Sequence, residues 1–301
     1  MSRVVFVTGC SSGFGRDLSE QLARQGDRVY ATMRGTEGKN AEAARALRAL
    51  AADERLDLRV LEVDVTSTSS VDSAAARVLA ESGAPDVVVN NAGQMFVGFT
   101  EAFTADEFSR QLDTNVVGVH RVNRAFLPAM RERRSGLIVQ MSSIAGRFGG
   151  PFFGVYHASK WALEGYSMAL RGELASSGVD VVVVEPGPFT TALFPSSPRP
   201  EDVDGRVGTY PPIAHQTFQG MGAAFEGIFQ DPDMPTNPQW VVDRIVALAW
   251  MDPGTRPFRS VVGIDFGVRE RNAAVEPFDA AVLEAFGMTS FATLAPDDRD
   301  G

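Results

Sequence analysis

Short, almost continuously apolar runs alternate along the chain with longer segments in which apolar residues recur every three or four positions. Strands that are apolar on both faces are typical of a parallel sheet covered by helices on both sides. Repeated strand–helix units with short connections therefore predict a doubly wound α/β fold, with seven parallel strands and helices on both faces. The predicted strands are Val4–Val7, Val29–Thr32, Leu58–Leu61, Val87–Val89, Leu137–Met141, Val179–Val184 and Ser260–Ile264.

Two regions depart from this alternation. Residues 189–238 are rich in Pro, Gly and Phe, with one predicted helix at Ala214–Phe229, and residues 265–301 contain one helical pattern at Pro277–Phe286 before an acidic end that is expected to fray. No repeat or low-complexity linker divides the chain, so we expect one domain over residues 1–264 and a C-terminal extension over 265–301 that packs on it or trails from it. The other predicted helices are Gly13–Gln25, Ala41–Ala52, Ser69–Glu81, Ala105–Arg133, Tyr156–Ser176 and Gln239–Trp250.

Composition and charge narrow the class of protein. The chain has 44% hydrophobic and 22% charged residues, as is ordinary for a soluble globular protein, and a formal net charge of −10 that disfavours nucleic acid and anionic membranes as partners. No apolar stretch reaches membrane-spanning length and no signal peptide precedes the first strand, so we expect a cytoplasmic protein. Cys10 is the only cysteine, which excludes an intramolecular disulfide, and the three histidines share no spacing that would predict a metal site.

A glycine-rich loop follows the first predicted strand and leads directly into a helix. Its sequence is Thr-Gly-Cys-Ser-Ser-Gly-Phe-Gly over residues 8–15. Glycines let a backbone turn sharply and approach a phosphate, and a helix N-terminus favours negative charge. A tight strand–helix turn would use the same residues, but the position in the first βα unit of a parallel sheet favours a dinucleotide site, as in Rossmann folds.

The end of the second strand indicates which dinucleotide is bound. An acidic residue there would hold the ribose 2′-hydroxyl of NAD(H), whereas a basic residue accommodates a 2′-phosphate. The strand has no acid at its end, and Arg34 follows at once. We therefore predict that NADP(H) is preferred over NAD(H), the alternative being that Arg34 only faces solvent. Asp64 and Val65 follow the third strand and are predicted to contact the adenine.

Tyr156 and Lys160 are the pair that indicates chemistry. Residues four apart on a helix share a face, so the phenol and the ammonium would lie side by side. Only two of the 28 basic residues are lysines, and one of them stands here. We expect this positive charge to lower the pKa of Tyr156, and the charge of an oxidised nicotinamide ring could supply the rest of the change needed for the phenol to exchange a proton near neutral pH. Alone, the pair could be a chance surface contact.

With these motifs in order, the chain resembles the short-chain dehydrogenase/reductase family of the Tyr-x-x-x-Lys type over roughly residues 3–264. The further motifs that carry the resemblance are Asn90-Asn91-Ala92-Gly93 after the fourth strand, Asn115 in the long helix, Ser142-Ser143 after the fifth strand and Pro186-Gly187 after the sixth. A weaker resemblance, over short stretches, is to 17-beta-hydroxysteroid and retinol dehydrogenases.

The resemblance implies a role for each of these residues. The family's serine lies thirteen residues before the tyrosine, which selects Ser143 over Ser142. Ser143 would position the substrate oxygen, Tyr156 would exchange the proton, Lys160 would support the phenolate and bind the nicotinamide ribose, and Asn115 would hold a water next to Lys160. Together with the loop, the predicted cofactor contacts are Gly9, Ser11, Ser12, Gly13, Phe14, Gly15, Arg34, Asp64, Val65, Asn91, Ala92, Gly93, Tyr156, Lys160, Pro186, Gly187 and Thr190.

The substrate is predicted to be hydrophobic or aromatic, because aromatic residues gather in loops at the expected site. The aromatic residues are Phe96, Phe148, Phe152, Phe153, Phe189, Phe194, Tyr210, Phe218, Phe225 and Phe229, and the apolar Met95 and Met221 accompany them. Packing in the core or in a dimer interface is the alternative for many of them.

The predicted function is thus NADP(H)-dependent interconversion of a ketone or aldehyde and its alcohol, in a homodimer or homotetramer as is usual in the family. A 3-oxoacyl-thioester reductase and a non-catalytic dinucleotide sensor remain alternatives.

Overall fold

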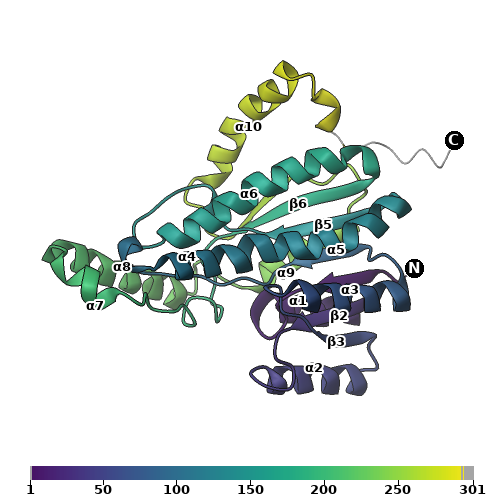
Figure 1. Cartoon of the computed structure of the whole chain (residues 1–301), viewed down its shortest axis with the longest axis horizontal. Coiled ribbons are helices and arrows are strands. Elements are labelled where there is room, and N and C mark those ends of the chain that lie inside the picture. The colour runs from purple at the N-terminus through teal and green to yellow at the C-terminus, as the bar shows by residue number, and fades with distance from the viewer. Residues whose placement is uncertain (1, 293, 295–301) are drawn as a thin grey trace.

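Seven parallel strands form a single sheet in the order β3-β2-β1-β4-β5-β6-β7. The computed structural model, which describes residues 2–292 and 294, confirms the predicted fold class (Figure 1). The first strand pairs with both β2 and β4, so the order of the strands reverses at this point, where open α/β sheets bind ligands. The strands are β1 (Val4–Val7), β2 (Arg28–Met33), β3 (Leu58–Glu62), β4 (Val87–Asn90), β5 (Gly136–Met141), β6 (Val179–Pro186) and β7 (Arg259–Val262).

Helices cover both faces of this sheet. On one face, α1 (Gly13–Arg24), α2 (Ala41–Asp53) and α9 (Gln239–Trp250) pack their apolar sides against alternate residues of the strands. On the other face lie α3 (Thr68–Ser82), α5 (Gly118–Arg133) and α6 (Gly154–Leu174). Because both faces are covered, the strands are apolar on both sides, which is the pattern that the sequence presents.

The prediction of one continuous helix over residues 105–133 is wrong. The chain forms α4 (Ala105–Leu112), a π-helical turn η2 (Asp113–Val117) and then α5. A π-helical turn inserts one residue into the helical ladder and is frequent at functional sites. This turn carries Asn115, so the departure from regular helix coincides with a predicted site residue.

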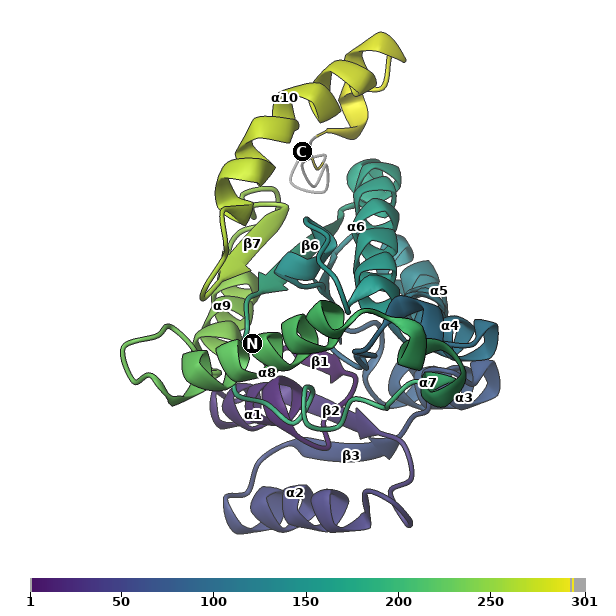
Figure 2. The same cartoon turned by 90° about the vertical axis from the view of Figure 1, so that its left-hand side faces the viewer.

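Residues 189–238 contain more helix than the sequence indicated. The short α7 (Val203–Arg206) precedes α8 (Pro212–Gln230), and the two lie together at one end of the molecule (Figures 1 and 2). The side chains of α8 pack against loops that precede α4 and α6. The segment therefore covers the end of the molecule where those loops meet.

The last long helix, α10 (Val268–Ala285), begins nine residues before the predicted helix and contains Pro277 in its interior. It projects away from the rest of the domain (Figures 1 and 2), and Phe278, Val282 and Phe286 are exposed along it. Residues 295–301, which include the end expected to fray, lie outside the described residues. No helix in the described part of the chain has the length and apolarity to cross a membrane.

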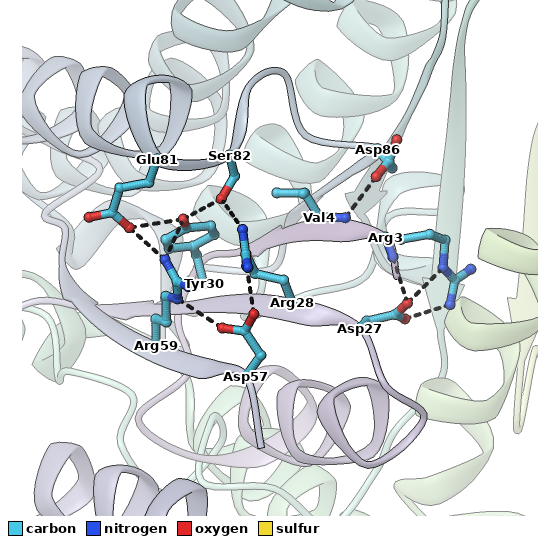
Figure 3. Close-up of polar contacts among 10 residues, drawn as sticks. All are labelled: Arg3, Val4, Asp27, Arg28, Tyr30, Asp57, Arg59, Glu81, Ser82 and Asp86. Atoms are coloured by element: carbon cyan, nitrogen blue, oxygen red, sulfur yellow. Dashed lines mark hydrogen bonds and ion pairs between the residues drawn. The ribbon is translucent and has the colours of Figure 1, made fainter. Parts of the chain in front are cut away.

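Ion pairs and hydrogen bonds join the elements at the edge of the sheet where the strands begin. Asp27 accepts from the guanidinium of Arg3 at 2.6 Å, and the backbone amide of Val4 donates to Asp86 at 2.7 Å. A second group joins β2, β3 and the end of α3, through Arg28, Tyr30, Asp57, Arg59, Glu81 and Ser82 (Figure 3). This ionic network fixes the N-terminal edge of the sheet, and the functional candidates follow the opposite edge.

Candidate active site

The glycine-rich loop follows β1 and touches the loop after β4. Gly9 has a φ of +74°, and a Cβ added to it would lie 2.7 Å from the Cα of Ala92. Gly15 leaves equally little room, since a Cβ there would lie 2.7 Å from the carbonyl oxygen of Gly9. Ser12 stands at the N-cap of α1, yet its side chain makes no capping hydrogen bond to any described residue. The amides of this helix end and the Ser12 hydroxyl can therefore serve a phosphate, which fits a dinucleotide.

Thr8 and Asn91 hold these two loops together. The Thr8 hydroxyl accepts hydrogen bonds from the amides of Asn91 and Ala92, at 3.0 and 2.9 Å. The Asn91 side chain donates back to the carbonyls of Thr8 and Gly9, at 2.9 and 3.1 Å. Asn90 points elsewhere, because its amide donates to Asn123 in the core at 2.7 Å. Thr8 is absent from the predicted contacts, although a polar residue at the end of an apolar strand is a signal that could have indicated it.

The region beyond β2 and β3 places one basic and one acidic side chain near each other. Arg34 is exposed, and its loop is fixed by Thr36, whose hydroxyl donates to Glu62 at 2.6 Å. Burial opposes ionisation of Asp64, but hydrogen bonds from Thr66 and the charge of Arg34 hold the pKa of this carboxyl below its usual value. Arg34 is thus an available cation at the position where a 2′-phosphate would be bound in this fold.

The loop after β6 packs against the glycine-rich loop and against the end of β7. Gly187 donates its amide to the carbonyl of Val262 at 2.9 Å, and a Cβ on it would collide with the carbonyl of Ile264. Phe14 of the glycine loop packs edge-on against Phe189, with ring centroids 5.7 Å apart. Pro186 is buried as the last residue of β6, and Thr190 is exposed.

Three predicted catalytic residues come together where β5 and α6 meet. Tyr156 and Lys160 are both 6% exposed, and the Lys160 Nζ lies 5.7 Å from the centroid of the Tyr156 ring. Lys160 donates to the carbonyl of Met141 at 2.7 Å. The Ser143 hydroxyl interacts with the phenol and donates to the carbonyl of Pro186 at 3.3 Å. The phenol, hydroxyl and ammonium are thus held by two different elements of the core.

The electrostatics of this group differ from the expectation drawn from the sequence. Burial raises the pKa of Tyr156 to about 12, although the Ser143 hydroxyl acts to lower it. Burial lowers the pKa of Lys160 to about 8, and the Glu164 carboxylate opposes that change. In the free protein the Tyr156 pKa thus moves in the opposite direction to the one expected from Lys160, because loss of hydration on burial raises it. The expectation also invoked the charge of an oxidised nicotinamide, which belongs to the cofactor-bound protein.

Asn115 is buried in the π-helical turn and ties three segments together. Its side-chain oxygen accepts from the amide of Gln94 at 2.9 Å, and its nitrogen donates to the Gln94 carbonyl at 2.9 Å and to the Ser159 hydroxyl at 3.0 Å. Both donors of the amide are therefore occupied. Asn115 connects the loop after β4, which includes Gly93, with the helix that carries Tyr156 and Lys160. Gln94 is absent from the predicted site residues, because it contacts Asn115 through its backbone and the type of its side chain gives no signal.

Apolar side chains surround the phenol. Met95, Ala145 and Tyr156 form one buried cluster, with Phe153 and Phe194 packed against it. Phe225 of α8 contacts Phe153 and Phe194, at centroid distances of 5.9 and 5.4 Å. A second cluster around Phe99 contains others of the predicted pocket residues, namely Phe152, Tyr210, Phe218 and Met221. Phe189 packs in the main core instead. The predicted set is thus divided between the wall next to Tyr156 and packing elsewhere.

Comparisons with known proteins agree with this geometry. The model of the short chain dehydrogenase family matches residues 3–202. The chain is 39% identical over 191 residues to 3-ketodihydrosphingosine reductase of Bacteroides thetaiotaomicron, covering 64% of this chain and 65% of that protein. It is 44% identical over 196 residues to human 17-beta-hydroxysteroid dehydrogenase type 1, covering 64% and 58%. The chain thus matches less than two thirds of the length of each of these two relatives.

A solved structure extends the likeness to nearly the whole chain. It is a short-chain dehydrogenase from Streptomyces avermitilis, 33% identical, with a TM-score of 0.75 over 95% of this chain and 98% of that one. The resemblance that the motifs predicted is confirmed by these matches.

Proposed function

This chain belongs to the short-chain dehydrogenase family, and from that membership we propose that it is an NADP(H)-dependent oxidoreductase that interconverts a hydrophobic ketone or aldehyde and its alcohol. The observation that carries the proposal is the convergence of Ser143, Tyr156 and Lys160 beneath an apolar wall. The loop after β6 joins this group to the glycine-rich loop, because Ser143 donates to the Pro186 carbonyl and Phe14 packs against Phe189. The two curated relatives named above point the same way, since 3-ketodihydrosphingosine and 17-beta-hydroxysteroids are both largely hydrocarbon.

The chain offers a dinucleotide the groups that its parts require. The pyrophosphate would take the amides at the start of α1 and the Ser11 and Ser12 hydroxyls, where Gly9, Gly13 and Gly15 give room for the approach. Phe14, Ala92, Gly93, Gly187 and Thr190 would border it, Asp64 and Val65 would meet the adenine, and Arg34 would pair with a 2′-phosphate. When bound, the reduced cofactor supplies the hydride.

In the direction of reduction, the hydroxyls of Ser143 and Tyr156 would donate hydrogen bonds to the carbonyl oxygen and hold it in place. As the carbonyl carbon accepts the hydride, its oxygen gains the electron pair of the C=O bond and takes the proton of Tyr156. The ammonium of Lys160 stabilises the phenolate that remains. In the direction of oxidation the phenolate takes the proton back, so the balance of charge is the same in both directions.

A substrate panel tests this function. Purified protein and NADPH would be given apolar ketones, aromatic aldehydes, an acetoacetyl thioester and small polar sugars, and turnover followed at the NADPH absorbance. We expect the highest kcat/KM for the apolar carbonyls and a loss of at least about 10³-fold in Tyr156→Phe. Tyr166→Phe, on the same helix, is the matched control. A preference for sugars would reject the apolar pocket, and NADPH binding without any turnover would favour the sensor.

The cofactor preference is tested at Arg34. A charge-assisted hydrogen bond is worth about 1.5–3 kcal/mol, so Arg34→Asp should raise the KM for NADPH about 10- to 100-fold and change the KM for NADH little. Arg45→Asp, at an exposed position of α2, is the control for a general change in surface charge. Equal losses with the two cofactors would contradict the role of Arg34, as would a wild-type protein that prefers NADH tenfold.

A further inference from the structure

His157 follows Tyr156 on α6, and its side chain packs against the serine loop, which is the segment of residues 143–153 between Ser143 and the start of the helix. The side chain is only 7% exposed, and its ring lies edge-on to Phe148 and Phe153, with centroids 5.3 and 5.9 Å apart. A buried imidazole loses the hydration of two nitrogen atoms, so each of them needs a partner. Both nitrogens have one, and both partners are backbone groups of the serine loop.

The two contacts join the two ends of this loop to the ring. Nδ1 of His157 lies 2.7 Å from the carbonyl oxygen of Ala145, and the amide of Gly150 donates to Nε2 at 3.0 Å. A carbonyl oxygen can only accept and an amide can only donate, so Nδ1 must carry the ring proton and Nε2 must be bare. The contacts thus require one particular tautomer, a demand that space-filling alone would not make.

Ala145 transmits the contact to the predicted catalytic serine. In the short turn η3 (Ile144–Gly146), the amide of Ala145 donates to the Ser143 Oγ at 3.1 Å. This bond occupies the serine oxygen as an acceptor and leaves its proton to be donated, in this structure to the Pro186 carbonyl at 3.3 Å. The position of the Ser143 hydroxyl therefore depends on Ala145, and the position of Ala145 depends on His157.

The far end of the serine loop is strained and needs similar support. Phe152 has a φ of +70°, a left-handed conformation that is costly for a residue with a side chain and persists only where the surroundings hold it. The amide of Gly98 holds it from one side by donating to the Phe152 carbonyl at 2.8 Å. His157 holds Gly150, two residues earlier in the loop. The next residue, Phe153, packs against the cluster that contains the reactive phenol.

We propose that His157 is a positioning residue that holds the Ser143 hydroxyl and the serine loop in register with Tyr156. This inference rests on the proposed function, in which that hydroxyl donates to the substrate oxygen. Reacting groups must be held to within about 0.5 Å, and the side chains behind them supply that precision. Because His157 and Tyr156 are neighbours on one helix, the bond to Ala145 sets the serine relative to the phenol.

The tautomer of His157 can be measured without cofactor or substrate. The chain has three histidines, so labelling with ¹⁵N-histidine gives three pairs of ring signals, and the spectra of His120→Asn and His215→Asn assign the remaining pair to His157. We expect a proton on Nδ1 and a bare Nε2 near neutral pH. A proton on Nε2, alone or together with one on Nδ1, would overturn the proposal, since such a ring could not make both contacts.

Three substitutions separate the two contacts. His157→Asn places an amide nitrogen where Nδ1 lies, His157→Gln places an amide oxygen near the position of Nε2, and His157→Phe keeps the shape of the ring but makes neither bond. We expect kcat for carbonyl reduction to fall by about 2- to 10-fold in His157→Asn, as for one neutral hydrogen bond. It should fall further in His157→Gln and by about 10²-fold in His157→Phe, as when reacting groups are displaced by about 1 Å. The KM for NADPH should stay close to the wild-type value.

A double-variant cycle shows whether His157 acts through the serine. In Ser143→Ala the hydroxyl to be positioned is gone, so adding His157→Phe should lower kcat by less than about tenfold further. The matched control is Trp161→Phe, on the same helix, which removes a different contact of the serine loop, the bond from the indole to the Phe148 carbonyl at 3.1 Å. Trp161→Phe should cost less than His157→Phe, and its loss should be the same with and without Ser143.

The exchange rate of the Ala145 amide proton reports its bond to Ser143 directly. In His157→Phe this proton should exchange with solvent at least about tenfold faster than in the wild type, because the turn that holds it opens more often. Circular dichroism and thermal unfolding check that the variants fold. Should His157→Phe not fold, His157→Gln, which also loses the bond to Ala145, takes its place in the cycle and in the exchange measurement.

The proposal would be overturned by equal losses of kcat on replacing His157 with and without the Ser143 hydroxyl, or by an unchanged exchange rate at Ala145. The ring signals and the exchange rate are measured in the free protein. They can therefore bear out the role of His157 in a protein that reduces no carbonyl, so that the failure of the proposed function is distinguished from the failure of this inference.

Discussion

Tyr156 should remain a protonated phenol in the free protein far above neutral pH, because burial raises its pKa to about 12 even with Lys160 beside the ring. Ionising it at pH 7 would require about five pH units of stabilisation, or about 7 kcal/mol. A unit positive charge about 4 Å away supplies about 4 kcal/mol at an effective dielectric of 20, which corresponds to about three pH units. The neutral reduced cofactor adds no such charge at its nicotinamide ring, whereas the oxidised cofactor does.

The directions of the reaction should therefore respond differently to pH. Carbonyl reduction needs the phenol, which stays protonated, so its alkaline loss should follow Lys160 near pH 8 and not Tyr156. Alcohol oxidation needs the phenolate, so its rate should rise with pH until Lys160 loses its charge. Saturating NADP⁺ should move the onset of Tyr156 ionisation down by about three pH units.

Tyrosinate absorbance near 295 nm measures this directly. The chain has four tyrosines, so the titration of Tyr156→Phe is subtracted from that of the wild type. The difference should be absent at pH 8–9 in the free protein and should appear there when NADP⁺ is bound. A tyrosinate signal from Tyr156 at pH 8 in the free protein would refute the reasoning, since it would mean that Lys160 outweighs burial.

Two substitutions test other parts of the structure. Ser143→Ala should lower kcat by about 10²-fold or more, because a hydrogen-bond donor at the reacting oxygen is lost. The control is Ser142→Ala, whose hydroxyl lies toward Glu164 and which should change kcat less than about threefold. Equal losses of kcat in the two variants would show that the wrong serine was assigned. Asp27→Asn breaks the buried ion pair with Arg3 and should lower the free energy of unfolding by about 3 kcal/mol. The Tm in thermal unfolding should then fall by about 5–10 °C, with kcat near the wild-type value. An unchanged Tm would contradict the importance of this pair.

The fold was predictable because each strand and most helices are indicated by residues that are close together in the sequence. Continuous apolar runs marked every strand, and the glycine loop stood where the first strand and helix meet. The break at residues 113–117 was not predictable in this way, since a π-helical turn preserves the apolar periodicity on both sides of it. Pro277 suggested a helix boundary, yet α10 continues through it as a largely exposed helix.

The candidate site was predictable in its residues but not in its electrostatics. Spacing on one helix places Tyr156 beside Lys160, but how deeply both are buried depends on loops and on α8, which come from distant parts of the chain. The sign of the Tyr156 pKa change follows from that burial. The contact between Glu164 and Arg259 joins residues 95 positions apart, and a single sequence contains no signal for it.

The ionic network lies where the strands begin (Figure 3), whereas the candidate site lies at the opposite edge of the same sheet, where the strands end. The contacts that hold the strands together and the loops that would select the substrate therefore lie on separate surfaces. The loops that border the phenol can exchange side chains over successive generations without loosening the ties between Arg3 and Asp27 or between Arg28 and Asp57. Such a division would allow the loops to fit other substrates while the proposed site for hydride transfer keeps its geometry.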